Sequence, residues 1–72
     1  MELRVNSKSE RESLSERLRE ARDAVALTQK ELADHLGVSA RTIQYWEAGN
    51  SPQPKKRRVV LDFVEFVEGR AA

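Results

Sequence analysis

The chain has 72 residues, no cysteine, one histidine and three glycines, with a formal net charge of +1. Without cysteine it has neither disulfide bonds nor thiolate metal ligands to brace the thin core that so short a chain can build, and one histidine excludes a multi-histidine zinc site. Three glycines leave no phosphate-binding loop of the GxxxxGK type, and no apolar run approaches the roughly 20 residues of a membrane span. We therefore expect no enzyme, no membrane protein, no metal and no cofactor.

The charge is distributed unevenly along the chain. Residues 39–58 contain five cations and a single acid, Glu47, for a net charge of +4, whereas residues 1–38 carry −1 and residues 59–72 carry −2. A basic block between acidic flanks indicates a surface that faces a polyanion.

The first helix is expected to end near residue 25. Residues 1–8 show no helical period and are predicted to form a flexible arm. Two capping boxes, at Ser9 and at Ser13, are possible starts for the helix. Its apolar residues follow the spacing i, i+4, i+7, i+11 on one narrow face and are Leu14, Leu18, Ala21 and Val25.

Two short helices are expected next, joined by a tight turn. Thr28 and Glu31 form a capping box for a helix over residues 28–36, which Gly37 ends by taking the left-handed conformation. Ser39 caps a helix over residues 39–48. Two helices joined by a turn that contains glycine form the helix-turn-helix arrangement.

A fourth helix is expected over about residues 55–68, after a stretch whose two prolines cannot lie in a regular helix. Acidic residues recur at every third position, which favours a helix even though the β-branched and aromatic content is typical of a strand. One broad face carries Val59, Val60, Phe63, Phe66 and Val67. The predicted fold class is all-α, with four helices and possibly a fifth element at the C-terminus.

The apolar face of the last helix is wider than one small core requires. At 100° per residue the apolar face of residues 59–67 spans roughly 160°, against about 100° for a helix that packs on a single domain. This surplus predicts a symmetric homodimer through the helix, and closure of the monomer core is the alternative. The residues of this dimer or core face are Val60, Phe63, Phe66 and Val67.

The helix over residues 39–48 carries the candidate recognition chemistry. Ile43 and Trp46 point to one side, and the remaining arc holds Arg41, Thr42, Gln44 and Tyr45. Arginine can pair with the two acceptors of guanine, glutamine can pair with adenine, and threonine or tyrosine can touch a thymine methyl. The alternative is that these side chains are ordinary surface residues.

The run Lys55–Arg58 places four cations in the first turn of the last helix, where the helix dipole disfavours positive charge. Helix stability does not explain this arrangement, whereas contact with phosphates would. A solvated basic patch and a nuclear import signal are the alternatives.

Several stretches of the chain together resemble the Cro and phage-repressor type of helix-turn-helix domain, also called the xenobiotic-response-element family. They cover about residues 14–54 and are Leu18–Arg22, Leu27–Ala33, Leu36–Ser39, Thr42–Ile43 and Trp46–Gly49. The resemblance implies a compact, lambda-repressor-like DNA-binding domain in the cytoplasm of a bacterium or encoded by a phage.

The resemblance also implies that helix 39–48 is the recognition helix. Family positions that contact bases or the adjoining backbone are occupied by Ala40, Arg41, Gln44 and Tyr45. Family positions that contact the DNA backbone are occupied by Gln29, Ser39 and Thr42. We add as further phosphate contacts Asn50, Lys55, Lys56 and Arg57.

Arg22 and Glu47 match a family ion pair that joins the first helix to the end of the recognition helix. Each residue lies at the flank of its helix's apolar stripe, which agrees with this assignment. The chain departs from the family at Ala40, whose short side chain limits base reading to a methyl contact, and after Gly49, where prolines and the basic run replace the usual Leu- and Ala-rich helix.

These observations predict a sequence-specific, double-stranded DNA-binding transcriptional regulator. The predicted mode is that of a repressor that binds a pseudo-palindromic operator as a homodimer. One alternative is an antitoxin that binds DNA and also a toxin protein. Another is a protein-interaction module on the same scaffold, because fold alone does not determine function.

Overall fold

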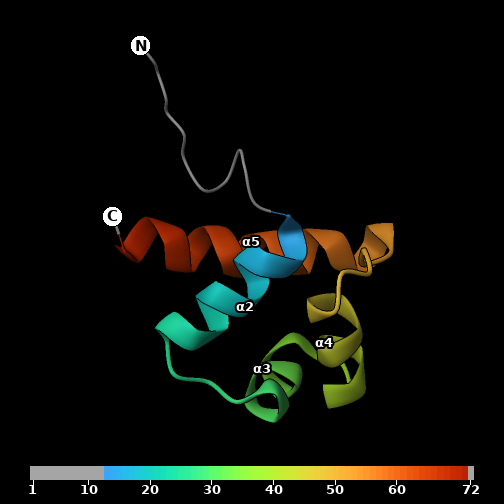
Figure 1. Cartoon of the computed structure of the whole chain (residues 1–72). Helices are drawn as coiled ribbons and strands as arrows, with labels where there is room; N and C mark the ends of the chain where they lie inside the picture. The colour runs from blue at the N-terminus through green and yellow to red at the C-terminus, as the bar shows by residue number, and fades with distance from the viewer. Residues whose placement is uncertain (1–12, 72) are drawn as a thin grey trace.

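The computed structural model describes residues 13–71 of the chain. These residues form four α-helices and no strand (Figure 1), which confirms the predicted all-α class; the helices are α2 (Leu14–Ala24), α3 (Gln29–Leu36), α4 (Ala40–Glu47) and α5 (Pro54–Ala71). No fifth element follows α5 in this part of the chain. The predicted arm over residues 1–8 and the capping box that begins at Ser9 lie outside the described residues.

Side-chain caps define the starts of the three shorter helices. Ser13 Oγ accepts from the backbone N–H of Glu16 at 3.2 Å, and Glu16 Oε1 accepts from the N–H of Ser13 at 3.2 Å. Thr28 and Glu31 form the same reciprocal pair at 3.0 and 2.8 Å. Ser39 Oγ accepts from the N–H of Thr42 at 3.1 Å. Helix α2 therefore begins at the second of its two predicted starts.

The longest helix exceeds its predicted range at both ends. Helix α5 begins at Pro54, one residue before the expected start, and runs to Ala71, beyond the expected end near residue 68. Proline suits the first helical position because the N–H that it lacks has no partner there in any case. The carbonyl of Gln53 accepts from the N–H of Arg57 at 2.8 Å and closes the first turn.

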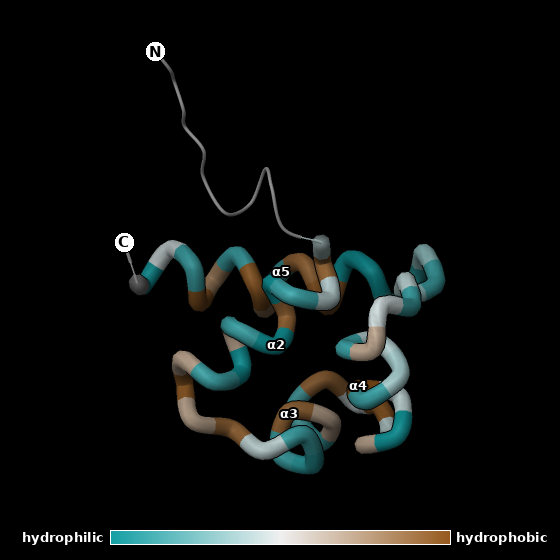
Figure 2. Tube along the Cα trace, viewed as in Figure 1, coloured by the Kyte–Doolittle hydropathy of each residue, from teal (hydrophilic) through white to brown (hydrophobic). Residues whose placement is uncertain are grey.

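The four helices enclose one small core. Figure 1 shows α5 along one side of the molecule, with α2 lying against it and α3 and α4 on the opposite side. The hydrophobic stretches of the helices turn inward (Figure 2). The buried side chains come from every helix and are Leu18, Ala21, Leu32, Ala33, Ile43, Trp46, Val60, Val64 and Val67.

The apolar residues of α5 divide into two groups, which corrects the single broad face predicted for them. Val60, Val64 and Val67 are buried at spacing i, i+4, i+7. Phe63 packs half-buried against the core, but Phe66 is 61% exposed. At 100° per residue Phe66 lies about 120° from Val60 around the helix, too far to share its side.

An ion pair fastens α2 to α5 outside the core. Arg17 Nε and Nη2 donate to the two carboxylate oxygens of Glu68, each at 2.9 Å. A bidentate contact of this kind fixes the relative orientation of the two side chains as well as their distance. The partner of Arg17 is 51 residues away in the chain.

The turn after α2 contains a residue in an unfavourable backbone conformation. Ala26 has φ +59°, and Leu27 N–H donates back to the carbonyl of Arg22 at 3.1 Å. This is the Schellman ending, in which the left-handed position is usually glycine. The other helix ends of this type use Gly37 at φ +76° and Gly49 at φ +111°. Alanine at this position is therefore strained.

Ala26→Gly should raise the free energy of unfolding by about 0.5–1 kcal/mol, because glycine adopts positive φ without the Cβ clash. Urea denaturation followed by circular dichroism measures the change. Ala24→Gly, in the last turn of α2, is the matched control and should lower the free energy of unfolding by a similar amount. A less stable Ala26→Gly protein would contradict the left-handed conformation.

Candidate nucleic-acid interface

Helix α4 is anchored on one side and exposed on the other. Ile43 and Trp46 are buried in the core at 0% and 5% exposure. Arg41, Gln44 and Tyr45 are exposed on the opposite side of the helix. The structure therefore holds α4 by its apolar stripe and presents the three predicted base-reading side chains to solvent.

The exposed side chains of α4 make no polar contact with the rest of the described chain. Within residues 13–71, the side chains of Arg41, Gln44 and Tyr45 make no hydrogen bond or ion pair. Tyr45 is 59% exposed, which is unusual for a large aromatic ring. Ala40, the fourth predicted base contact, is half-buried and packs against the core.

Both ends of α4 are closed by polar side chains that were predicted to contact the DNA backbone. Ser39 caps the start of the helix, and its hydroxyl lies 3.0 Å from that of Thr42. At the other end Asn50 Nδ2 donates to the carbonyl of Tyr45 at 2.9 Å. These three residues thus have a role within the protein, and that role fixes the length and ends of α4.

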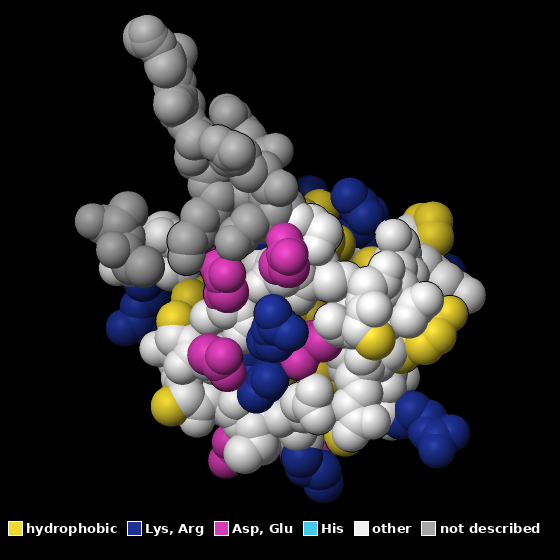
Figure 3. Space-filling view, viewed as in Figure 1, with side chains coloured by type: hydrophobic (Ala, Val, Ile, Leu, Met, Phe, Trp, Pro, Cys, Tyr) yellow, Lys and Arg dark blue, Asp and Glu magenta, His cyan; other side chains and the backbone are white. Residues whose placement is uncertain are grey.

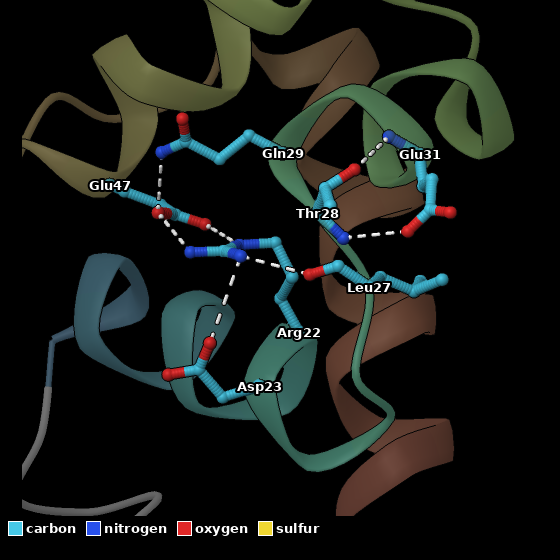
Figure 4. A network of polar contacts seen from close by, with 7 residues as sticks. All are labelled: Arg22, Asp23, Leu27, Thr28, Gln29, Glu31 and Glu47. Atoms are coloured by element: carbon cyan, nitrogen blue, oxygen red, sulfur yellow. Dashed lines mark hydrogen bonds and ion pairs between the residues drawn. The ribbon is translucent and has the colours of Figure 1, made fainter.

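A network of polar contacts joins α4 to α2 and α3 (Figure 4). Arg22 Nε donates to Glu47 Oε2 at 2.7 Å, and Arg22 Nη2 donates to Glu47 Oε1 at 3.1 Å. Gln29 Nε2 donates to Glu47 Oε1 at 3.0 Å, and Arg22 Nη1 donates to the carbonyl of Leu27 at 2.9 Å. The structure therefore brings the predicted pair Arg22 and Glu47 together and adds Gln29 to it. We call Arg22, Gln29 and Glu47 the carboxylate clamp.

The carboxylate clamp is largely shielded from water. The side chain of Glu47 is 6% exposed and that of Arg22 is 14% exposed. The hydrogen bond to Glu47 raises the pKa of Arg22 above its ordinary value, against the opposing effect of burial. The charged guanidinium donates two parallel bonds to the carboxylate, which are stronger than bonds between neutral groups.

Gln29 lies where a phosphate could approach. It is the first residue of α3, a position where the backbone N–H groups and the helix dipole favour an anion. Its side-chain amide is held by Glu47 through one of the two hydrogens on Nε2. The second hydrogen makes no hydrogen bond within the described residues, and the backbone contact of Gln29 stays a prediction.

The basic run at the start of α5 divides into two parts. Arg58 Nε and Nη2 both donate to Asp62 Oδ1, at 3.0 and 2.7 Å, and Glu65 lies 3.8 Å from the same guanidinium. The hydrogen bond to Asp62 raises the pKa of Arg58. The other three cations have no acidic partner in the part of the chain that the structure describes; they are Lys55, Lys56 and Arg57.

The acidic residues of α5 were not explained by the sequence, but the structure accounts for them. Asp62 and Glu65 pair with Arg58 on the same helix, and Glu68 pairs with Arg17 of α2. The i, i+4 spacing of Arg58 and Asp62 was visible in the sequence as a signal for pairing. No sequence signal connects Arg17 with Glu68.

The unpaired cations and the exposed side of α4 belong to neighbouring segments. Figure 1 shows α4 and the start of α5 at the same end of the molecule, joined by a short loop. In Figure 3 acidic and basic side chains alternate over the middle of the visible face, while lysine and arginine side chains project from its edges. Among the described residues, no three His, Asp or Glu side chains gather as metal ligands would, and no helix could cross a membrane.

Comparison with known protein families gives a match over most of the chain. Residues 13–68 match the family described as a helix-turn-helix domain. This range contains all four helices except the last residues of α5. No solved structure matches the chain.

Glu47→Ala should lower the free energy of unfolding by about 3 kcal/mol, because the guanidinium of Arg22 loses its carboxylate in a shielded site. Urea denaturation measures the loss. Asp34→Ala is the matched control: it removes an exposed carboxylate that pairs with Lys30 at 3.1 Å and should change stability by less than about 1 kcal/mol. Equal losses in the two variants would contradict the assigned role of the carboxylate clamp.

Proposed function

The chain belongs to the helix-turn-helix domain family, and on that premise we propose that it is a sequence-specific, double-stranded DNA-binding transcriptional regulator. A helix-turn-helix domain suggests DNA binding, and α4 is the second helix of the motif, the one that enters the major groove. The proposed mode is repression, in which the bound protein occupies a pseudo-palindromic operator and blocks access to it.

One observation carries this proposal. Arg41, Gln44 and Tyr45 are exposed and unpaired within the described residues, yet they project from a helix whose position is fixed on its other side. Base reading requires side chains that are free to bond outward and a backbone that does not move. The backbone of α4 is held in place by the buried side chains of Ile43 and Trp46 and by the carboxylate clamp.

The proposed base contacts follow from the chemistry of these side chains. Arg41 can donate two parallel bonds to N7 and O6 of guanine, and Gln44 can pair with N7 and N6 of adenine. The aromatic ring of Tyr45 can contact a thymine methyl. Ala40, at the start of α4, can contribute a methyl contact but no hydrogen bond.

The proposed phosphate contacts surround the recognition helix on both sides. The start of α3 offers the backbone N–H groups and the amide of Gln29. The start of α5 offers Lys55, Lys56 and Arg57, which have no internal acidic partner among residues 13–71. Phosphate contacts of this kind set the register of α4 on the duplex without reading its sequence.

A repressor of this size would bind its operator as a pair. Two copies related by a two-fold axis would place their recognition helices about 34 Å apart, on successive turns of the major groove. The operator would then be a pseudo-palindrome with half-sites roughly 10 base pairs apart.

Arg41→Ala should weaken operator binding by about 1–3 kcal/mol and relax the preference at one base pair in each half-site, because the bidentate contact with guanine is lost. Selection of bound sites from random duplex DNA, followed by titration of the selected site, measures both effects. Arg19→Ala, which removes an exposed arginine of α2, is the control and should leave the selected sequence unchanged. An Arg41→Ala protein with the parent's affinity and sequence preference would refute the assignment of α4.

Lys55→Ala should weaken binding to all DNA sequences about equally and reduce the salt slope of log K by about one, because one phosphate contact releases about one counterion. Titrations at several salt concentrations measure the slope. Arg58→Ala is the matched control within the same run, since Arg58 already pairs with Asp62, and it should change the slope less. A parent protein whose DNA binding does not fall steeply with salt would instead favour a protein-interaction module.

A further inference from the structure

The outer face of α5 carries an exposed aromatic residue. Phe66 is 61% exposed and lies away from the buried stripe of Val60, Val64 and Val67. The guanidinium carbon of Arg70 lies 5.5 Å from the centre of the Phe66 ring and leaves the rest of the ring uncovered. Together with Leu36, Val59 and Phe63, which line one groove with it, Phe66 forms an apolar patch, and a contiguous exposed apolar patch is a typical sign of a contact surface.

A groove lies beside Phe66, between α5 and the end of α3. Its volume is about 320 Å³, large enough to accept a phenyl ring, and it is lined by His35, Leu36, Val59, Asp62, Phe63 and Phe66. The His35 and Phe63 rings meet edge to face with centroids 6.3 Å apart, which fixes one wall. None of the side chains proposed to contact DNA lines this groove.

We propose that this groove binds a second copy of the chain, through an antiparallel pair of α5 helices that cross at Phe66. Asp62 and Arg70 lie four residues before and four residues after Phe66, so the three residues form one ridge along the helix surface. When two such ridges run antiparallel, Asp62 of each copy meets Arg70 of the other. This contact therefore occurs twice about the two-fold axis.

Charge selects this arrangement over the parallel one. A parallel pair would place Asp62 against Asp62 and Arg70 against Arg70, and like charges in contact are repulsive. Asp62 retains acceptor capacity for the partner's arginine, because both bonds from Arg58 end on Oδ1. The surface is therefore complementary to itself in charge as well as in shape, and that argues for a second copy as its occupant.

The aromatic contacts agree with the same pairing. At the usual crossing angle of about 50° for two i±4 ridges, Phe66 of each copy faces the groove of the other, beside Phe63. Aromatic rings that bury their area in this way are the usual energetic centre of an interface. Val60 and Val67 take no part because they are buried in the protomer.

This inference deepens the proposed function, since a two-fold pair supplies the two recognition helices of a pseudo-palindromic operator. The contacts proposed for the pair do not involve DNA, so the pairing is tested with the protein alone. Failure of the proposed function would show as DNA binding without sequence preference or salt dependence, and failure of the pairing would show as a monomer without DNA.

Sedimentation equilibrium of the full chain without DNA should show a dimer at tens of micromolar, and Phe66→Arg should weaken it roughly 100-fold or more. Phe66 is exposed, so circular dichroism and thermal unfolding should be close to those of the parent. Val25→Arg, which places the same charge on another exposed apolar residue, 38% exposed, should leave the dimer intact. A parent monomer at these concentrations, or a Phe66→Arg dimer as tight as the parent's, overturns the proposal.

Cross-linking tests the position of the two-fold axis independently of affinity. The chain has no cysteine, so Phe66→Cys introduces one thiol that should oxidise to a covalent dimer, because residue 66 of one copy meets residue 66 of the other. Val25→Cys is the control and should stay monomeric under the same oxidation. Equal yields from the two variants overturn the pairing.

A charge exchange tests the antiparallel register. Asp62→Arg and Arg70→Asp should each weaken the dimer by about tenfold, because each creates two like-charge contacts, and the double variant should recover most of the loss. Asp62→Arg also removes the contact between Arg58 and Asp62. Circular dichroism checks that this variant keeps the helix content of the parent. A double variant no tighter than the weaker single variant overturns the antiparallel register.

Discussion

The carboxylate of Glu47 is the contact on which the geometry of this domain depends. Its two oxygens accept two bonds from Arg22 of α2 and one from Gln29 of α3, so three helices meet at one group that is 6% exposed. The buried side chains supply most of the stability, but apolar contacts have little directional preference. A bidentate ion pair does have one. The orientation of α4 relative to α2 and α3, and with it the direction in which Arg41 points, therefore depends on this clamp.

The cations of the chain fall into two groups, according to whether they contact a carboxylate of the same chain. Arg17 and Arg22 contact carboxylates on other helices and so join α2 to α5 and to α4, whereas Arg58 contacts carboxylates within α5. Three cations without an acidic partner in the described part of the chain adjoin the exposed side of α4, at the start of α5; they are Lys55, Lys56 and Arg57. A small net charge thus conceals two populations, one that stabilises the fold and one that is free to bind an anion.

Helix α5 shows how a helix can be predicted correctly while its faces are not. Its acidic period identified the helix, but the apolar set drawn from the sequence included Phe66 and omitted Val64, which is fully buried. Between residues 59 and 67 of α5 every residue except Asp62 and Glu65 is apolar, so periodicity alone allowed more than one buried stripe. The carboxylate clamp was predicted in part. The positions of Arg22 and Glu47 beside their apolar stripes and the family resemblance both indicated this ion pair. Nothing in the sequence indicated that Gln29 also bonds to Glu47.

The sequence by itself determined where α3 and α4 start and end and left two possible starts for α2, because caps and left-handed turns act between residues at most five apart. The capping hydroxyls accept from backbone N–H groups three residues away and belong to Ser13, Thr28 and Ser39. Their effect can therefore be predicted from neighbouring residues in the sequence. The tertiary structure alone decided which side of α5 is buried and which carboxylate Arg17 contacts. Those choices depend on where three other helices stand, and contacts across 51 residues leave no local pattern in the chain.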